Sequence, residues 1–195
     1  MGGHLFVVHG DLRTLRCDHW LLPVDTGFST SRSWNQSSAW RRIMGFLPSL
    51  MPPGQRVFEV PWSGPARPWP TNVASGRRTP PTWLAESVRQ FLHQASTAPS
   101  TLNRDRPLLA LPIVGTGYGG KRRFAGDVLN SVFPALDGFV EDHDVDVALV
   151  TWTEEDFAAA QAARRQHGRT RWEEELSPLL LRFPISHRAY PFCNF

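Results

Sequence analysis

Cysteine, lysine and long apolar runs are all scarce in this 195-residue sequence. The two cysteines, Cys17 and Cys193, are far apart and provide neither a disulfide framework nor a metal-binding spacing. No apolar run approaches the roughly 18 residues that a membrane-spanning helix needs. The opening, "MGGHLFVVHGDLR", lacks the three regions of a signal peptide. We therefore expect a cytoplasmic protein with no membrane partner, no metal and no cofactor.

Lys121 is the only lysine, so arginine supplies nearly all of the positive charge in a chain of net charge +3. The arginine fork binds phosphate through two N–H groups and stacks on flat rings, which favours a phosphate-bearing partner. A GC-rich genome produces the same bias and is the simpler explanation. The arginines are dispersed rather than gathered in one stripe, so nucleic-acid binding is the weakest function considered.

Short apolar runs alternate with helical periodicities along the chain. Strands are predicted at residues 5–8, 20–24, 57–60, 108–114 and 145–152. Helices are predicted at residues 80–96, 121–144 and 153–168, the last with Thr153 as its N-cap and Gly168 as its end. This alternation predicts an α/β fold, a three-layer α/β/α sandwich with a central mixed, mostly parallel sheet.

Two segments interrupt the alternation. Residues 61–82 hold six prolines and are predicted to be a long connection with one short strand near 72–74. The chain after residue 167 is predicted to form a short helix in "RWEEELSPLLL" and ends in the aromatic stretch "FPISHRAYPFCNF". We expect this segment to pack on the domain or on a partner, and it is the candidate for joining copies of the chain. The predicted organisation is one domain over 1–167 followed by a C-terminal segment over 168–195.

A glycine-rich loop follows the most apolar strand, in the stretch "LPIVGTGYGG". Gly115, Gly117 and Gly120 match the pattern G-x-G-x-x-G, and backbone N–H groups in such a loop can bind an anion. A Rossmann unit needs an acidic residue about 20 positions later, and Glu154 comes too late for that role. A nucleoside-triphosphate loop needs Lys-Ser/Thr after its last glycine, where this chain has "KRR". A tight turn without a ligand is the alternative.

Two carboxylates follow two other predicted strands. Asp11 comes after the first strand, in "VVHGDL", and can accept a hydrogen bond from an exocyclic amine such as that of adenine. Asp25 comes after the second, in "LLPVDTGF". Taken alone, Asp11 is better explained as a helix cap or a turn residue, and Asp25 has the same alternative.

Together these strand ends resemble the macro domain, the ADP-ribose-binding α/β/α family. The family opens with a strand ending in Gly-Asp, as "VVHGDL" does, and later has an apolar strand, a Gly-Thr-Gly-aromatic-Gly loop and a helix. The resemblance covers about residues 4–167. It implies that Asp11 binds the adenine amine, that residues 115–119 wrap the diphosphate, and that residues 25–28 form the opposing loop. The implied ligand-binding residues are Asp11, Leu12, Thr26, Gly27, Phe28, Val114, Gly115, Thr116, Gly117, Tyr118, Gly119 and Gly120.

The resemblance also implies an activity, hydrolysis of mono-ADP-ribose from acidic side chains of modified proteins. Asp25 is the candidate general base, and Lys121 is the alternative as an amine nucleophile. The family's Asn-Ala-Ala-Asn stretch is missing, because "PVDTGFSTS" stands in its place. A non-catalytic reader of ADP-ribose, or of a related nucleotide derived from NAD, is the alternative function. The expected partners are ADP-ribose and ADP-ribosylated protein.

The tryptophans divide into two groups. Trp20 and Trp152 lie in strand patterns and are predicted to be core residues. Trp34, Trp40, Trp62 and Trp69 lie in irregular stretches, where they are expected to cover loops against the core rather than to stack on bases.

Overall fold

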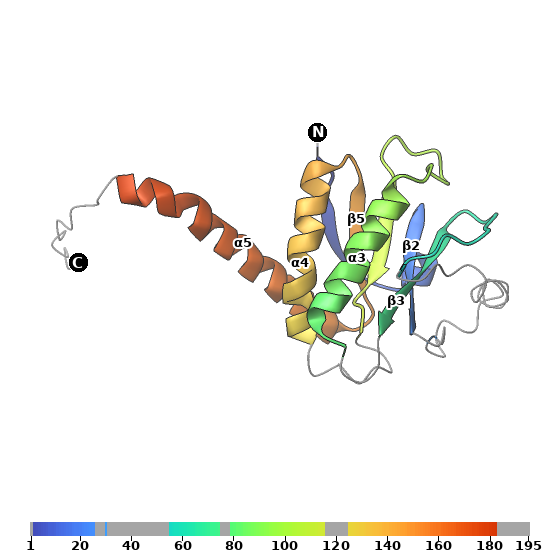
Figure 1. Ribbon diagram of the computed structural model, residues 1–195, viewed down its shortest axis with the longest axis horizontal. Coiled ribbons are helices and arrows are strands. Elements are labelled where there is room, and N and C mark those ends of the chain that lie inside the picture. Colours follow the sequence, from blue (N-terminus) through green and yellow to red (C-terminus); the bar gives the residue numbers. More distant parts are fainter. Residues whose placement is uncertain (1, 26–29, 31–54, 75–78, 116–124, 183–195) are drawn as a thin grey trace, which may run out of the picture.

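The computed structural model describes residues 2–25, 30, 55–74, 79–115 and 125–182 (Figure 1). The strands are β1 (Leu5–His9), β2 (His19–Asp25), β3 (Arg67–Ala74), β4 (Leu108–Pro112) and β5 (Asp146–Thr151). The helices are the 3-10 helix η1 (Leu12–Thr14) and the α-helices α3 (Pro81–Ser96), α4 (Ala125–Asp142) and α5 (Glu154–Arg182). Across these ranges, no helix combines the length and apolar character that a bilayer span requires.

The five strands form one sheet in the order β1-β5-β4-β2-β3, and all of its strand pairs are parallel. This confirms the predicted α/β class with a mostly parallel sheet. Parallel pairing places every carboxyl end at one edge of the sheet. The segments that follow the strands therefore gather at that edge, where open α/β sheets bind ligands.

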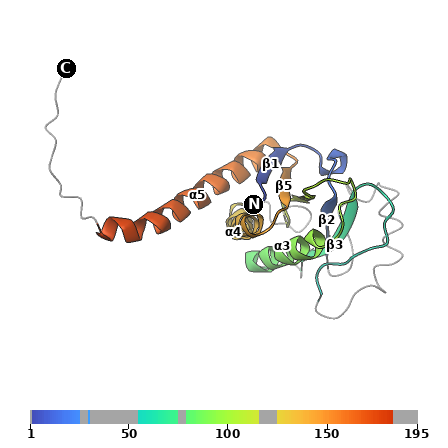
Figure 2. The ribbon, with the colours of Figure 1, turned by 90° about the horizontal axis from the view of Figure 1, so that it is seen from above.

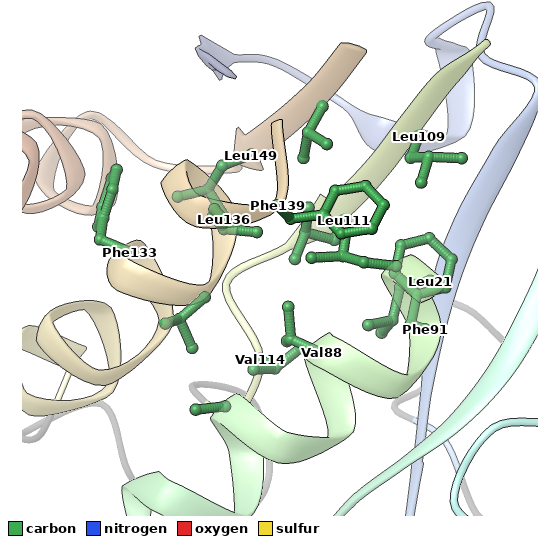
Figure 3. Packing of buried hydrophobic residues seen from close by; sticks show 14 of the residues in the cluster. Leu21, Val88, Phe91, Leu109, Leu111, Val114, Phe133, Leu136, Phe139 and Leu149 are labelled. Atoms are coloured by element: carbon green, nitrogen blue, oxygen red, sulfur yellow. The ribbon is translucent and has the colours of Figure 1, made fainter. Parts of the chain in front are cut away.

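Most of the apolar core lies on one face of this sheet. Figure 3 shows Phe91 of α3 beside Leu21 of β2, and Leu136 of α4 beside Leu149 of β5, within one apolar cluster. In α3 and α4, apolar residues recur three or four positions apart, which is why one face of each of these helices is buried. The opposite face carries small residues such as Ala110 and Ala148, and it is covered in part by Leu12 of η1 and by Cys17 in the connection that follows η1.

The predicted strand at 57–60 is wrong. Within the described chain, that segment makes a single antiparallel bridge, Val57 with Thr71, and the fifth strand is β3, inside the proline-rich connection. We expected only a short strand near 72–74, because proline removes a backbone donor from a sheet.

The prolines of β3 are tolerated because of where they face. The backbone N–H of Arg67 points toward β2, where it donates to Asp18 O (2.9 Å). Backbone groups alternate in direction along a strand, so those of every second residue after position 67, beginning with Pro68, point away from β2 to the open side of the sheet. Pro68 and Pro70 are among them, and Pro70 O accepts from Phe58 N–H on that open side (3.0 Å). The missing N–H groups thus fall at the sheet edge, the position where strands accept proline.

The predicted end of the last helix at Gly168 is also wrong. Thr153 does cap the helix, because its Oγ1 accepts from Asp156 N–H (3.1 Å), but α5 continues to Arg182. A glycine inside a helix costs only about 1 kcal/mol relative to alanine. Beyond the sheet, α5 extends away from the rest of the fold, as both views show (Figures 1 and 2).

A buried carboxylate, Asp18, fixes the segment between α3 and β4 to the start of β2. Its side chain is fully buried and accepts from Leu102 N–H (3.0 Å), Leu108 N–H (2.9 Å) and the Ser100 hydroxyl. Burial alone would raise the pKa of Asp18. The hydrogen bonds from Leu108, Ser100 and Leu102, with the charge of Arg104, outweigh this and lower the pKa below its usual value.

Replacing this carboxylate tests its contribution to stability. We expect Asp18→Asn to lower the free energy of unfolding by about 2–4 kcal/mol, because an amide leaves buried donors without an acceptor. Urea unfolding measures the difference. Asp105→Asn makes the same chemical change at an exposed position of the same segment and should have almost no effect.

The pH dependence of that difference provides a second check. Because the folded pKa is lowered, the contribution of ionised Asp18 is fully present above its unfolded pKa of about 3.9 and is lost as pH falls through the folded pKa. The wild-type advantage over Asp18→Asn should therefore shrink below about pH 4. A constant advantage down to pH 2 would show that the charge is not what stabilises the fold.

Candidate functional site

Four strand ends meet at the carboxyl edge of the sheet. His9 of β1 pairs with Thr151 of β5, and Gly10 N–H donates to Thr151 O (2.9 Å). Asp11 follows Gly10, and Trp152 follows Thr151. The two residues therefore leave the sheet from neighbouring positions. In the same way, Asp25 ends β2, and Gly115 follows the adjacent strand β4.

Asp11 is the N-cap of η1 and is held by Arg13. Its Oδ1 accepts from Arg13 N–H (2.9 Å) and from Arg13 Nε (2.9 Å), and its Oδ2 accepts from Arg13 NH2 (2.7 Å). The side-chain hydrogen bond from Arg13 lowers the pKa of Asp11 below its usual value. The carboxylate is therefore ionised at neutral pH and can only accept hydrogen bonds.

Trp152 belongs to this site rather than to the core, so that prediction is wrong. Its side chain is 64% exposed, because β5 ends at Thr151 and the next residue leaves the sheet. The guanidinium carbon of Arg13 lies 5.3 Å from the centroid of the Trp152 ring. Its position immediately after the last strand was the sequence signal that could have identified it. Trp20, the other predicted core tryptophan, is partly buried against the second face of the sheet.

The start of the glycine loop has a backbone that favours glycine. Gly115 has a φ of +77°, and a Cβ at this position would lie 2.9 Å from Leu84 Cδ1 of α3. Val114, just before it, is buried in the main core. The loop is thus anchored to the sheet and to α3 at its first residue.

Several of the predicted site residues lie outside the described part of the chain. They are Thr26, Gly27, Phe28, Thr116, Gly117, Tyr118, Gly119, Gly120 and Lys121. Of the described ones, Asp11, Asp25 and Gly115 lie at the carboxyl edge, while the side chains of Leu12 and Val114 are buried beneath it. The structure adds Arg13 and Trp152 to this set.

The described residues offer little for metal or thiol chemistry. Among them, no group of three or more His, Cys, Asp or Glu side chains could hold a metal ion. Burial raises the pKa of the Cys17 thiol to about 12. Cys17 is therefore protonated at neutral pH and is unsuited to act as a nucleophile.

Comparison with known proteins shows which solved structures share this architecture. No family model matches the sequence, and no curated protein matches it at the sequence level. Among solved structures, the Oceanobacillus iheyensis macrodomain with ADP is similar, with a TM-score of 0.62, 13% identity, and coverage of 84% of this chain and 91% of that one. The chain has the macro-domain fold.

A second macrodomain, from Trypanosoma brucei, matches less completely. Its complex with ADP has a TM-score of 0.57 and 15% identity, and the match covers 82% of this chain and 68% of the other. The same protein has been solved in complex with ADP-ribose, with a TM-score of 0.53. These likenesses confirm the resemblance to the macro domain at the level of the fold.

The conformation of Gly115 can be tested by adding a single methyl group. We expect Gly115→Ala to lower the free energy of unfolding by about 1–2 kcal/mol, because an L side chain is strained at positive φ. Thermal unfolding measures the change. Gly126→Ala is the matched control, since a Cβ there meets nothing within 4 Å and alanine favours the helix α4. Equal stabilities for the two variants would contradict the strained conformation.

Proposed function

We propose that this protein binds ADP-ribose at the carboxyl edge of its sheet and hydrolyses mono-ADP-ribose from acidic side chains of modified proteins. The observation that carries the proposal is that Arg13 contacts both an ionised carboxylate, Asp11, and an exposed indole, Trp152, at the sheet edge where the glycine loop also begins. The ADP and ADP-ribose complexes of the Oceanobacillus and Trypanosoma macrodomains support it.

The adenine half of the ligand matches the first two residues. Adenine offers an exocyclic N–H donor and a flat π-face. An ionised carboxylate accepts from such a donor, and an exposed indole stacks on such a face. Asp11 and Trp152 follow paired residues of β1 and β5, so one base can contact both.

The diphosphate half matches the loop that begins at Gly115. A backbone at positive φ aims successive N–H groups into one concavity, which suits an anion. β4 lies between β5 and β2 in the sheet, so this loop starts between the proposed adenine contacts and Asp25. A ligand with adenine at one end and ribose at the other would cross it in that order.

Hydrolysis is assigned to Asp25, at the far end of this path. In the proposed step, the Asp25 carboxylate takes a proton from water as the water oxygen bonds to the anomeric carbon of the distal ribose. The bond from that carbon to the carboxylate oxygen of the modified side chain breaks, and the carboxylate leaves. Lys121 is the alternative, as an amine nucleophile toward the opened ribose.

Titration calorimetry with ADP-ribose tests the binding half. We expect a dissociation constant on the order of micromolar, tighter than for AMP or NAD. Asp11→Ala and Trp152→Ala should each weaken it by about tenfold, since stacking on an aromatic ring is worth about 1–3 kcal/mol per base. Phe6→Ala removes another exposed aromatic, early in β1, and should leave affinity unchanged. Absence of heat with every ligand would overturn the proposal.

Release of ADP-ribose from a protein modified on acidic side chains tests the hydrolytic half. We expect Asp25→Ala to slow release by about 10²-fold or more, the usual contribution of a general base, while binding is retained. If Lys121→Met has that effect instead, the amine route is correct. If the wild type binds ADP-ribose but leaves the modified protein intact, the protein is a reader.

A further inference from the structure

Arg13 occupies both of the groups that we assign to adenine. Its Nε lies 2.9 Å and 3.0 Å from the two carboxylate oxygens of Asp11, and its NH2 lies 2.7 Å from Oδ2. The same guanidinium lies over the ring of Trp152, 5.3 Å from its centroid. One planar group thus contacts the acceptor and the stacking surface at once.

The carboxylate has little capacity left for another donor. An ionised carboxylate has about four lone-pair positions. Arg13 directs three N–H groups at it: Nε–H is shared between the two oxygens, NH2 donates to Oδ2, and the backbone N–H donates to Oδ1 (2.9 Å). An amine that is to bind Asp11 therefore competes with the guanidinium for the same oxygens.

The guanidinium and the amine-bearing edge of adenine are chemically alike. Both are flat, both donate N–H groups in their own plane, and both stack on an indole. Arg13 therefore makes the contacts with Asp11 and Trp152 that a bound adenine would make.

We propose that Arg13 is a specificity-determining residue that competes with adenine for Asp11 and Trp152 and thereby relaxes the selectivity of the site for the base. The inference rests on the proposed ADP-ribose binding. A 6-oxopurine has an acceptor at position 6 where adenine has a donor, and its remaining donor on that edge is N1–H. Its O6 can therefore accept from a guanidinium that stays in place. Arg13 thus penalises adenine and tolerates a 6-oxopurine.

The competition is modest in size, because the ion pair is exposed to solvent. Its side chains are 39% exposed for Arg13 and 24% for Asp11. Exposed ion pairs and cation–π contacts are each weak. We therefore expect removal of the guanidinium to tighten ADP-ribose binding by about three- to tenfold.

The experiment compares ADP-ribose with its inosine counterpart, which carries a 6-oxo group in place of the amine. Dissociation constants for both are measured by calorimetry on the wild type and on Arg13→Ala. The variant keeps the backbone N–H bond to Asp11, and so it keeps the cap of η1. Arg16→Ala is the matched control, because it removes the same charge from the same segment between β1 and β2. The contact between Arg16 and Arg104 is made by the Arg16 backbone oxygen, so this substitution keeps it.

Arg13→Ala should bind ADP-ribose more tightly than the wild type, and its preference for ADP-ribose over the inosine ligand should widen. Arg16→Ala should change neither quantity. Binding of ADP-ribose by Arg13→Ala alone would support the competition but overturn the proposed function for the wild type. If the wild type binds and Arg13→Ala binds equally or more weakly, or if the preference between the two bases does not widen, the competition is wrong while the proposed function stands. Binding of neither ligand by any variant would overturn the proposed function and this inference with it.

Discussion

The parallel direction of all five strands determines where everything else in this structure is placed. It sends the four strand ends that carry Asp11, Asp25, Gly115 and Trp152 to one edge of the sheet. The opposite edge is left for interactions that stabilise the fold, and the Asp18 carboxylate there ties three backbone and side-chain donors together. The candidate site and the buried Asp18 cluster are thus separated by the length of a strand.

The sequence predicted the regular part of this fold because the physical signals there are local. The run "LLALPIV" is too apolar for any position but the centre of a covered sheet, and β4 is indeed central. The apolar spacing of Val88, Phe91 and Leu92 was enough to predict α3. β3 could not be predicted in the same way. Whether Pro68 and Pro70 are tolerated depends on which neighbour lies on each side of the strand, and that is a property of the whole sheet.

The sequence predicted those residues of the candidate site that come shortly after a strand. Asp11, Asp25 and Gly115 each follow an apolar run, and parallel topology brings such positions together. Trp152 was taken for a core residue because a strand pattern does not state where the strand ends. The role of Arg13 depends on its guanidinium contacting both the Asp11 carboxylate, two residues earlier, and the Trp152 ring, just after another strand. No sequence pattern predicts these two contacts together. The residues of the glycine loop beyond Gly115 stay predictions.

The length of α5 has a mechanical consequence. A continuous helix of 29 residues spans about 44 Å at a rise of about 1.5 Å per residue. Its first turns are anchored to the main core through Ala160 and Ala163, and His167 lies 3.3 Å from Asp137 of α4. Beyond these contacts, the helix extends away from the sheet (Figures 1 and 2). Anything attached to the far end of this helix would therefore be held away from the sheet rather than against it.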